Sequence, residues 1–324
     1  MAYDVSIIVP VYKAEKYIKK CATSLFEQDF ISIEYIFADD CSPDNSIEKL
    51  EGIIVTYPDR KKDIKLIRNK SNLGSGATRG VGMKYATGEY VIQIDADDWI
   101  EPNMISLLYK EAKDEKADIV CCDYYLESVS NIEIISYLMP LDKNEIVNTF
   151  AVMPTYMNYL WNKLVRRQIY LDNNIVFPDD ISLCDDLYVT FKLVYLANKV
   201  VQINRPLYHY NQLNFNSITS NHNLKSFYDK LAVTNEIVSF LQQQDSIEEY
   251  ENLINFYKVY SKLLLILNGT MRDDELWSAT YPESNDYIWK VALRLDYKVL
   301  TWLCSKNQFR AAYLLQDLKA IFKK

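Results

Sequence analysis

The sequence has little histidine and little glycine for its length, and its cysteines lack the spacing of metal ligands. Among 324 residues there are two His, seven Gly and six Cys. No two cysteines form a C-x-x-C pair, which argues against a zinc site and against a disulfide framework. The cysteines are therefore expected to be reduced thiols in a cytoplasmic protein.

Long apolar runs and an excess of positive charge are also missing. No stretch reaches the roughly 18 apolar residues of a membrane-spanning helix. The first apolar run begins at Val5, so no signal peptide is expected. Lys and Arg number 36 against 44 Asp and Glu, a formal charge of −8 that argues against a nucleic-acid binder. The length fits a soluble enzyme with one large domain, or with a main domain and an extension.

The most informative segment is residues 90–98, an apolar run that ends in the carboxylates Asp95, Asp97 and Asp98. In open α/β sheets, ligand sites gather at the carboxyl ends of the strands. Carboxylates this close repel one another unless a positive group lies between them. Mg²⁺ or Mn²⁺ bridging to a diphosphate would relieve the repulsion, whereas a solvated turn is the plain alternative.

Further apolar, β-rich runs cover residues 5–12, 33–40 and 64–68, and they alternate with segments of helical spacing at 18–25 and 45–57. This alternation predicts βαβ units and a parallel sheet. The expected fold class is α/β, with a doubly wound, mostly parallel sheet and helices on both faces.

Four motifs occur in order along the first 110 residues or so, and together they resemble those of family 2 glycosyltransferases with the GT-A fold. They are Pro-Val-Tyr at 10–12, Asp-Asp-Cys-Ser-Pro-Asp-Asn-Ser at 39–46, Asn-Leu-Gly-Ser-Gly-Ala-Thr-Arg-Gly at 72–80 and the acidic segment at 90–99. The resemblance implies an inverting transfer of a sugar from a nucleotide donor, most often UDP-linked, to a hydroxyl acceptor.

In such a family the first two motifs contact the nucleoside. Pro10, Val11 and Tyr12 would lie under the base, and Asp40, or alternatively Asp39, would accept the uracil imide N–H or pair with a ribose hydroxyl. The same residues also read as an Asx-turn with a helix cap, and both interpretations can hold together.

The third motif opens a helix after two glycines, so that its backbone N–H groups can approach a phosphate and Arg79 can add a fixed charge. Asn72 and Gly74 belong to this loop. The family usually has Asn after the arginine, whereas this chain has Gly80, which puts any contact specific to Asn in doubt. The alternative is a tight turn with a solvent-facing arginine.

For the fourth motif, the resemblance implies that Asp95, with Ala96 beside it, contacts the donor and that Asp97 holds the metal. Asp98 either assists or caps the turn. His209 either reaches the metal or diphosphate or is an ordinary strand histidine, and Lys163 either approaches the phosphates or is a surface lysine beside a packed tryptophan. The metal set is Asp97, Asp98 and His209.

Asp185 and Asp186 stand where the family usually reads Glu-Asp before a helix. Inverting transfer needs a base that takes the proton of the acceptor hydroxyl. We expect Asp186 to be this base and Asp185 to contact acceptor hydroxyls, with the helix N-terminus keeping both ionised. Two simple N-terminal acids are the alternative.

Beyond residue 224 the spacing turns helical, with helices expected at 231–241, 253–267 and 300–322. The predicted domains are residues 1–220 for the transferase and 221–324 for an all-helical extension. A polar segment at 211–223 is expected to close over the donor. The basic last helix fits a peripheral contact with the inner face of the cell membrane, although packing on its own domain is favoured.

The predicted partners are a nucleotide sugar and a glycan or lipid-linked acceptor, with a homo-oligomer possible. Two alternatives compete with a glycosyltransferase. A nucleotidyltransferase would carry a Gly-rich, Lys-containing signature near residue 10, which the sequence lacks. The second is a non-catalytic subunit of a glycan assembly complex, which either binds nucleotide sugars or serves as a partner, and the intact acidic motifs argue against it.

Overall fold

The computed structural model describes residues 3–129, 131–181, 183–214 and 223–322. The chain divides into two compact units, one of residues 1–147 with 155–216 and one of residues 148–154 with 217–324. The assignment of a transferase domain and an extension to these parts stays a prediction. Most of the segment expected to close over the donor lies outside the described residues.

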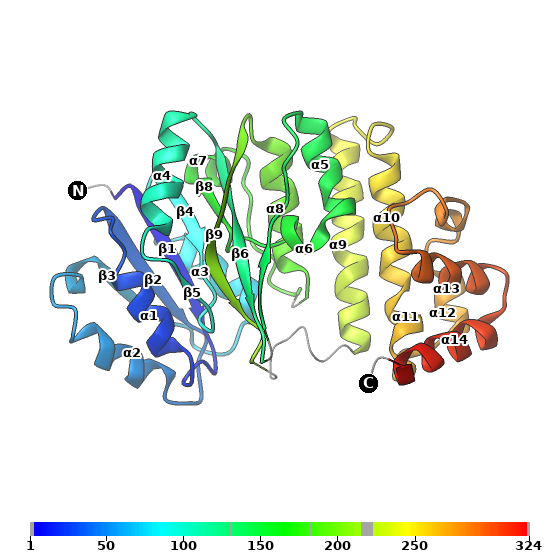
Figure 1. Cartoon of the computed structure of the whole chain (residues 1–324), viewed down its shortest axis with the longest axis horizontal. Helices are drawn as coiled ribbons and strands as arrows, with labels where there is room; N and C mark the ends of the chain where they lie inside the picture. The colour runs from blue at the N-terminus through cyan, green and yellow to red at the C-terminus, as the bar shows by residue number, and fades with distance from the viewer. Residues whose placement is uncertain (1–2, 130, 182, 215–222, 323–324) are drawn as a thin grey trace. The chain divides into compact units, whose positions relative to one another are not determined.

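A nine-stranded sheet runs through the first unit in the order β3-β2-β1-β4-β8-β6-β9-β5, and β7 pairs with β6 (Figure 1). The first four strands are parallel neighbours, as predicted, whereas β8 is antiparallel to β4 and β6. The bounds are β1 (Val5–Val11), β2 (Ile33–Asp39), β3 (Ile64–Arg68), β4 (Tyr90–Gln93), β5 (Trp99–Ile100), β6 (Ile119–Glu127), β7 (Ile132–Ile135), β8 (Lys163–Arg166) and β9 (Val200–Asn211).

Helices cover both faces of the sheet. Phe26 at the end of α1 packs edge-on against Tyr35 and Phe37 of β2, with ring centroids 5.2 and 6.0 Å apart. Met83 at the end of α3 packs on the opposite face, with Ile8 and its neighbours. The helices of this part of the chain are α1 (Ile18–Phe26), α2 (Ser46–Ile54), η1 (Lys61–Asp63), α3 (Ser75–Met83), α4 (Met104–Asp114), α5 (Lys143–Val152), α6 (Pro154–Met157), α7 (Arg167–Asp172) and α8 (Asp185–Leu196).

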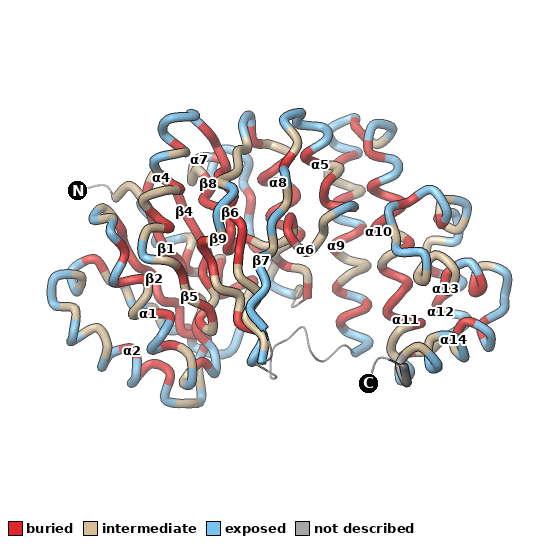
Figure 2. The backbone as a smooth tube through the Cα atoms, in the orientation of Figure 1, coloured by how far each residue is buried: buried red, intermediate tan, exposed pale blue. Residues whose placement is uncertain are grey.

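Because the central strands are covered on both sides, they are buried along their length, and every residue of β2 is buried (Figure 2). The parallel register pairs Val11 with Asp39 and Asp39 with Arg68. The carboxyl ends of β1, β2 and β3 therefore meet at one edge. The loop after β4, which carries the acidic motif, emerges at the same edge, since β4 is parallel to β1.

The second unit is built from helices around a core that includes Phe227, Leu265, Trp277 and Leu300. No helix in the described part of the chain is long and apolar enough to cross a membrane. The bounds are α9 (Leu224–Gln243), α10 (Glu251–Lys262), α11 (Leu264–Leu267), η3 (Gly269–Met271), α12 (Asp274–Ala279), η4 (Pro282–Tyr287), α13 (Leu295–Ser305) and α14 (Phe309–Phe322).

The prediction of a single helix over residues 300–322 is wrong, because α13 ends at Ser305 and a separate helix, α14, begins at Phe309. Asn307 adopts a left-handed conformation with φ of 58°. Its N–H donates to the carbonyl of Cys304 at 2.9 Å, and the Gln308 N–H donates to that of Leu303 at 2.9 Å. This is the Schellman arrangement, which ends a helix and which Asn can adopt in place of Gly.

Candidate active site

Arg79 is the centre of the predicted site. It is buried on α3, and its guanidinium bridges the acidic loop after β4 to the start of α8. Nη2 lies 2.5 Å from Oδ1 of Asp95, and Nη1 lies 3.1 Å from Oδ2 of Asp185 and 3.6 Å from Oδ1 of Asp186. The interpretation of a solvent-facing arginine is thereby excluded. Segments separated by about a hundred residues in the sequence meet on one side chain.

Close packing of α3 against the start of α8 produces this arrangement. A Cβ added to Gly76 would lie 3.2 Å from Cβ of Asp185 and 3.0 Å from the carbonyl oxygen of Pro178. Ser75 at the first position of α3 donates from Oγ to Oδ2 of Asp185 at 3.2 Å. Cys184, immediately before α8, has a left-handed backbone with φ of 68°, an uncommon conformation for a residue with a side chain.

Burial controls the ionisation of the two aspartates at the start of α8. It raises the pKa of Asp186 to about 7, although the charge of Arg79 acts in the opposite direction and that of Asp185 adds to the rise. Burial also raises the pKa of Asp185. The expectation that the helix N-terminus keeps Asp186 fully ionised near neutral pH is therefore wrong, because desolvation of its carboxylate outweighs the helix dipole.

Within the acidic loop, both carboxylate oxygens of Asp98 accept hydrogen bonds from other residues of the chain. Its Oδ2 accepts from the hydroxyl of Tyr208 at 2.5 Å, and its Oδ1 accepts from the Asn211 N–H at 2.8 Å. Asp97 differs, since its Oδ2 accepts from Nδ2 of Asn214 at 2.8 Å and its Oδ1 makes no hydrogen bond within the described residues. Ala96 between them is buried.

His209 lies in a carboxylate clamp. Its Nδ1 is 2.7 Å from Oε1 of Glu127 and its Nε2 is 2.8 Å from Oε1 of Glu101, while Trp99 and Tyr125 stack on the two faces of the ring. Both ring nitrogens are thus engaged by carboxylates. The arrangement leaves no nitrogen for a metal ion, so it does not favour the metal role predicted for His209.

The described residues contain no group of three His, Cys, Asp or Glu side chains placed to hold a metal ion. The predicted set of Asp97, Asp98 and His209 is therefore not assembled into a metal centre in this arrangement. Asp97 alone keeps an oxygen available. Mg²⁺ is often bound by one or two carboxylates together with substrate phosphates, and a single carboxylate with a free oxygen fits that mode.

Asp40 ties the loop before α3 to the end of β2. Its Oδ1 accepts from the Leu73 N–H at 2.7 Å and from Nδ2 of Asn69 at 2.9 Å, and its Oδ2 accepts from the Gly74 N–H at 2.9 Å. Asn72 is nearby, with Nδ2 3.5 Å from the carbonyl oxygen of Asp40. The backbone N–H groups predicted to face a phosphate are thus turned to a carboxylate.

Asp39, the alternative nucleoside contact, is also buried and engaged. Its Oδ1 accepts from the Ser42 N–H at 2.9 Å, and its Oδ2 pairs with Nε of Arg68 at 2.9 Å. The Asx-turn expected from the sequence is formed by Asp44, whose Oδ1 accepts from the Ser46 N–H at 3.2 Å. Pro10 and Val11 end β1, and Val11 faces the core. Tyr12 follows and is exposed, so its ring is accessible to a base.

Lys163, at the start of β8, is fully buried, and so the alternative of a surface lysine is wrong. Its ammonium donates to the carbonyls of Tyr156 and Tyr159 at 3.1 and 2.6 Å and to Oδ1 of Asn162 at 2.7 Å. Burial lowers its pKa to about 8. The charge of Asp186 in the Arg79 cluster acts in the opposite direction on the pKa of this ammonium. The predicted contact of Lys163 with phosphate stays a prediction.

Similarity to known proteins indicates the family and the fold of this chain. The model of the family described as "Glycosyl transferase family 2" matches residues 6–182, which is more than half of the chain. The chain belongs to glycosyl transferase family 2. EpsH of Bacillus subtilis, which is named as a glycosyltransferase, is 31% identical over 82% of this chain and 76% of its own length.

Solved structures agree on the fold of this family 2 member. The crystal structure of Staphylococcus aureus TarS 1–349 with UDP-GlcNAc aligns with a TM-score of 0.72 at 20% identity, covering 97% of this chain and 90% of that one. A mannosyltransferase of Pyrobaculum calidifontis, in complex with GDP-Man and Mn²⁺, aligns with a TM-score of 0.52 at 15% identity, covering 100% and 88%. The GT-A fold predicted from the sequence is confirmed, and so is the class of enzyme, a glycosyltransferase.

Several residues that hold this family 2 site together were not predicted. Ser75, Tyr208 and Asn214 each donate to an aspartate of the site. Tyr208 and Asn214 belong to no motif, and Ser75 lies within the motif at 72–80 without a role assigned to it, because the partners of all three lie about a hundred residues away. The only available signal for Ser75 was its place at the start of a glycine-flanked helix.

Proposed function

We propose that the chain transfers a sugar, with inversion, from a nucleotide-sugar donor to a hydroxyl of a glycan or lipid-linked acceptor. The observation that carries this proposal is the buried Arg79 cluster, in which Asp186 keeps one carboxylate oxygen, Oδ1, without a hydrogen bond among the described residues. A carboxylate with a spare oxygen at the carboxyl edge of the sheet is suited to receive a proton.

In the proposed reaction, Asp186 takes the proton of the acceptor hydroxyl while the acceptor oxygen attacks C1 of the sugar. The bond from C1 to the phosphate oxygen breaks, and its electron pair leaves with the nucleoside diphosphate. A general base works best when its pKa lies near the operating pH, and burial places that of Asp186 at about 7. The role of Asp185 as a contact to acceptor hydroxyls stays a prediction.

Arg79 acts on this base through its charge. Burial lowers the pKa of Arg79, but Asp186, Asp95 and Asp185 together raise it, so the guanidinium stays charged. A fixed positive charge beside Asp186 keeps its conjugate base accessible near neutral pH. Because the same guanidinium holds Asp95, we propose that it also fixes the carboxylate that faces the donor.

We propose a UDP-linked donor. TarS holds UDP-GlcNAc in its solved structure, and the exposed ring of Tyr12 at the end of β1 is available to stack on the base. Asp40 and Asp39 remain the proposed nucleoside contacts. The present hydrogen bonds of Asp40 to the loop before α3 imply that nucleotide binding rearranges this loop.

A divalent cation fits this site through Asp97, which alone of the predicted ligands has a carboxylate oxygen without a hydrogen bond to another residue in the described part of the chain. Such an ion, when bound with the donor, would neutralise charge developing on the diphosphate. The mannosyltransferase of similar fold holds Mn²⁺ with its GDP-Man.

The proposal is tested by the melting temperature of the chain with UDP, GDP, CMP or dTDP, each with and without Mn²⁺. A ligand that binds only the native state raises the melting temperature by mass action. We expect a shift with UDP that increases with Mn²⁺. A shift with another nucleotide would change the donor but keep the enzyme class. No shift with any nucleotide would favour a non-catalytic partner subunit instead.

A further inference from the structure

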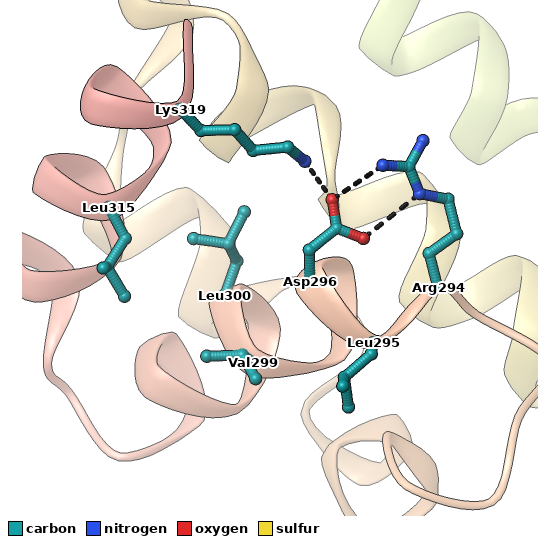
Figure 3. A pocket seen from close by; sticks show the side chains of 7 residues that line it. All are labelled: Arg294, Leu295, Asp296, Val299, Leu300, Leu315 and Lys319. Atoms are coloured by element: carbon teal, nitrogen blue, oxygen red, sulfur yellow. Dashed lines mark hydrogen bonds and ion pairs between the residues drawn. The ribbon is translucent and has the colours of Figure 1, made fainter. Parts of the chain in front are cut away.

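An apolar pocket of about 690 Å³ opens on the second unit, between α13 and α14 (Figure 3). Its size lies within the range of about 300–1,000 Å³ that is typical of small-molecule sites. The described residues that line it are Arg294, Leu295, Asp296, Val299, Leu300, Leu315 and Lys319. None of them belongs to the Arg79 cluster.

The apolar part of the lining is open to solvent. Leu300 forms a buried floor, whereas Leu295 on α13 is 70% exposed and Leu315 on α14 is 46% exposed. Leu314 and Leu318 are exposed as well, and the spacing of 314 and 318 places them one turn apart on α14. Soluble proteins seldom leave apolar side chains gathered in this way unless the surface binds something.

Charged groups lie along one side of the pocket. Asp296 is held between Arg294, with Nη2 to Oδ2 at 3.0 Å, and Lys319, and Figure 3 shows both cations pointing to this carboxylate. The two cations also lie 4.9 and 5.0 Å from the ring centroid of Tyr297. The rim therefore has one more positive than negative charge, with an aromatic ring beside it.

The charge of this part of the sequence sets it apart. Residues 288–324 contain eight Lys or Arg and two Asp, a formal charge of +6, whereas the remaining 287 residues carry −14. An anionic surface would repel most of the chain and attract this segment. Basic residues interleaved with exposed apolar ones are typical of peripheral contact with anionic lipid.

We propose that α13 and α14 form a docking surface for an anionic lipid bilayer, with an aliphatic lipid chain entering the pocket and Arg294 and Lys319 facing the phosphates. The charge complementarity selects this occupant over a zwitterionic bilayer, and the aliphatic lining of the pocket with the exposed leucines selects a lipid over an acidic protein. The inference does not depend on the transfer reaction, and the pocket, the exposed leucines and the basic segment support it without reference to the proposed active site.

Vesicle flotation of the full chain tests this surface. We expect binding to vesicles of phosphatidylcholine mixed with phosphatidylglycerol, little binding to phosphatidylcholine alone, and release as salt screens the charges. The double variant Leu295→Glu with Leu315→Glu should weaken binding about tenfold or more, since both apolar contacts are lost and two negative charges are added. Lys319→Gln should weaken it about fivefold, which corresponds to about 1 kcal/mol for one cation near an anionic surface.

Matched controls lie on the first unit. Val55→Glu with Leu171→Glu adds the same charge at side chains that are 72% and 50% exposed, and Lys110→Gln removes an exposed cation. These variants should bind vesicles like the wild type. The circular dichroism and melting temperature of each variant show whether it is folded.

Three results would overturn the proposal. The first is the absence of vesicle binding by the wild type, and the second is an equal loss in the control variants. The third is self-association of the wild type that the Leu295→Glu, Leu315→Glu variant abolishes, which would make this face an interface between two copies of the chain. Each of these leaves nucleotide binding unaffected, so failure here is distinct from failure of the proposed function.

Discussion

Oδ1 of Asp186 lies 3.6 Å from Nη1 of Arg79 but accepts no hydrogen bond from any residue that the structure describes. Arg79 instead directs its short contacts to Asp95 and Asp185, at 2.5 and 3.1 Å. A buried carboxylate oxygen beside a cation, yet without a hydrogen bond, is costly to maintain. We connect that cost to function, since it leaves one oxygen able to accept a proton.

The first prediction concerns Asp186→Asn. The amide has nearly the same shape but cannot act as a base, so transfer should fall by about 10²- to 10⁴-fold, the usual contribution of general base catalysis. Donor binding should be retained. The measurements are turnover of the donor and the nucleotide-induced shift in melting temperature. Asp179→Asn, an exposed acid before α8, is the control. Normal turnover by Asp186→Asn would show that the base is another group.

The second prediction is a pH dependence. Because burial raises the pKa of Asp186 to about 7, kcat/KM should rise with pH and level off above about 7, where the carboxylate is ionised. The free energy of unfolding should instead fall as pH rises. The folded state binds the proton more tightly than the unfolded state, whose pKa is about 3.9, so this group lowers the free energy of unfolding as pH rises from about 4 to 7.

The Asp186→Asn variant also tests the predicted pH dependence of stability. In Asp186→Asn the titrating group is gone, so the melting temperature should depend less on pH over this interval than in the wild type. A rate profile that is flat between pH 5 and 8, measured as kcat/KM, would contradict the second prediction, as would an unchanged pH dependence of melting in the variant.

The third prediction is that loss of the charge of Arg79 moves the rate profile to higher pH. The Arg79 charge lowers the pKa of Asp186. Arg79→Gln should therefore move the rising part of the profile of kcat/KM to higher pH, and Arg79→Lys should move it less. The Gln variant should also lose about 3–5 kcal/mol of stability, because it leaves buried carboxylates without a partner. The readouts are the pH profile of kcat/KM and urea unfolding. A Gln variant of reduced activity but unshifted profile would assign Arg79 a structural role only.

The sequence was sufficient for those features that depend on local patterns. The apolar runs before Asp39 and before Asp95 predict two buried parallel strands, and the structure confirms both. The motifs also predict the meeting of the strand ends at one edge, which follows from parallel pairing alone.

Features that depend on distant neighbours could not be predicted in this way. His209 fits a metal ligand by sequence, but its ring nitrogens meet Glu101 and Glu127, each on a different strand or loop. For Asp186, the helix N-terminus was visible in the sequence but the burial that outweighs it was not. Nor does the sequence indicate the left-handed backbone of Cys184, since this conformation is usually adopted by Gly or Asn.

The fourth prediction separates two roles of Asp40. As the acceptor for the Leu73 and Gly74 N–H groups it stabilises the protein without ligand, so Asp40→Ala should lower the free energy of unfolding by about 2 kcal/mol, because two partly buried N–H groups and the buried Asn69 amide lose an acceptor. A residue that only reads the base would leave the stability of the ligand-free protein unchanged. Urea unfolding without nucleotide distinguishes these outcomes. Glu48→Ala, an exposed acid on α2, is the control.

The fifth prediction compares two glycines of α3. A Cβ added to Gly80, where the family usually has Asn, would lie 3.4 Å from Cβ of Phe177, an ordinary contact, whereas a Cβ on Gly82 would lie 2.4 Å from Cγ2 of Ile8 in β1. Gly80→Ala should therefore gain about 0.5–1 kcal/mol from helix propensity. Gly82→Ala should lose about 1–3 kcal/mol, because the helix must move away from the sheet.

The activities of the same two variants test whether α3 positions Arg79. If α3 positions Arg79 through its packing on β1, Gly82→Ala should lower kcat/KM as well as stability, whereas Gly80→Ala should leave kcat/KM unchanged. Urea unfolding and donor turnover, measured on both variants, check the pair. A loss of activity in Gly80→Ala without loss of stability would instead mean that the space beside Gly80 is needed by the substrate, and that the departure from Asn at this position is a feature of recognition.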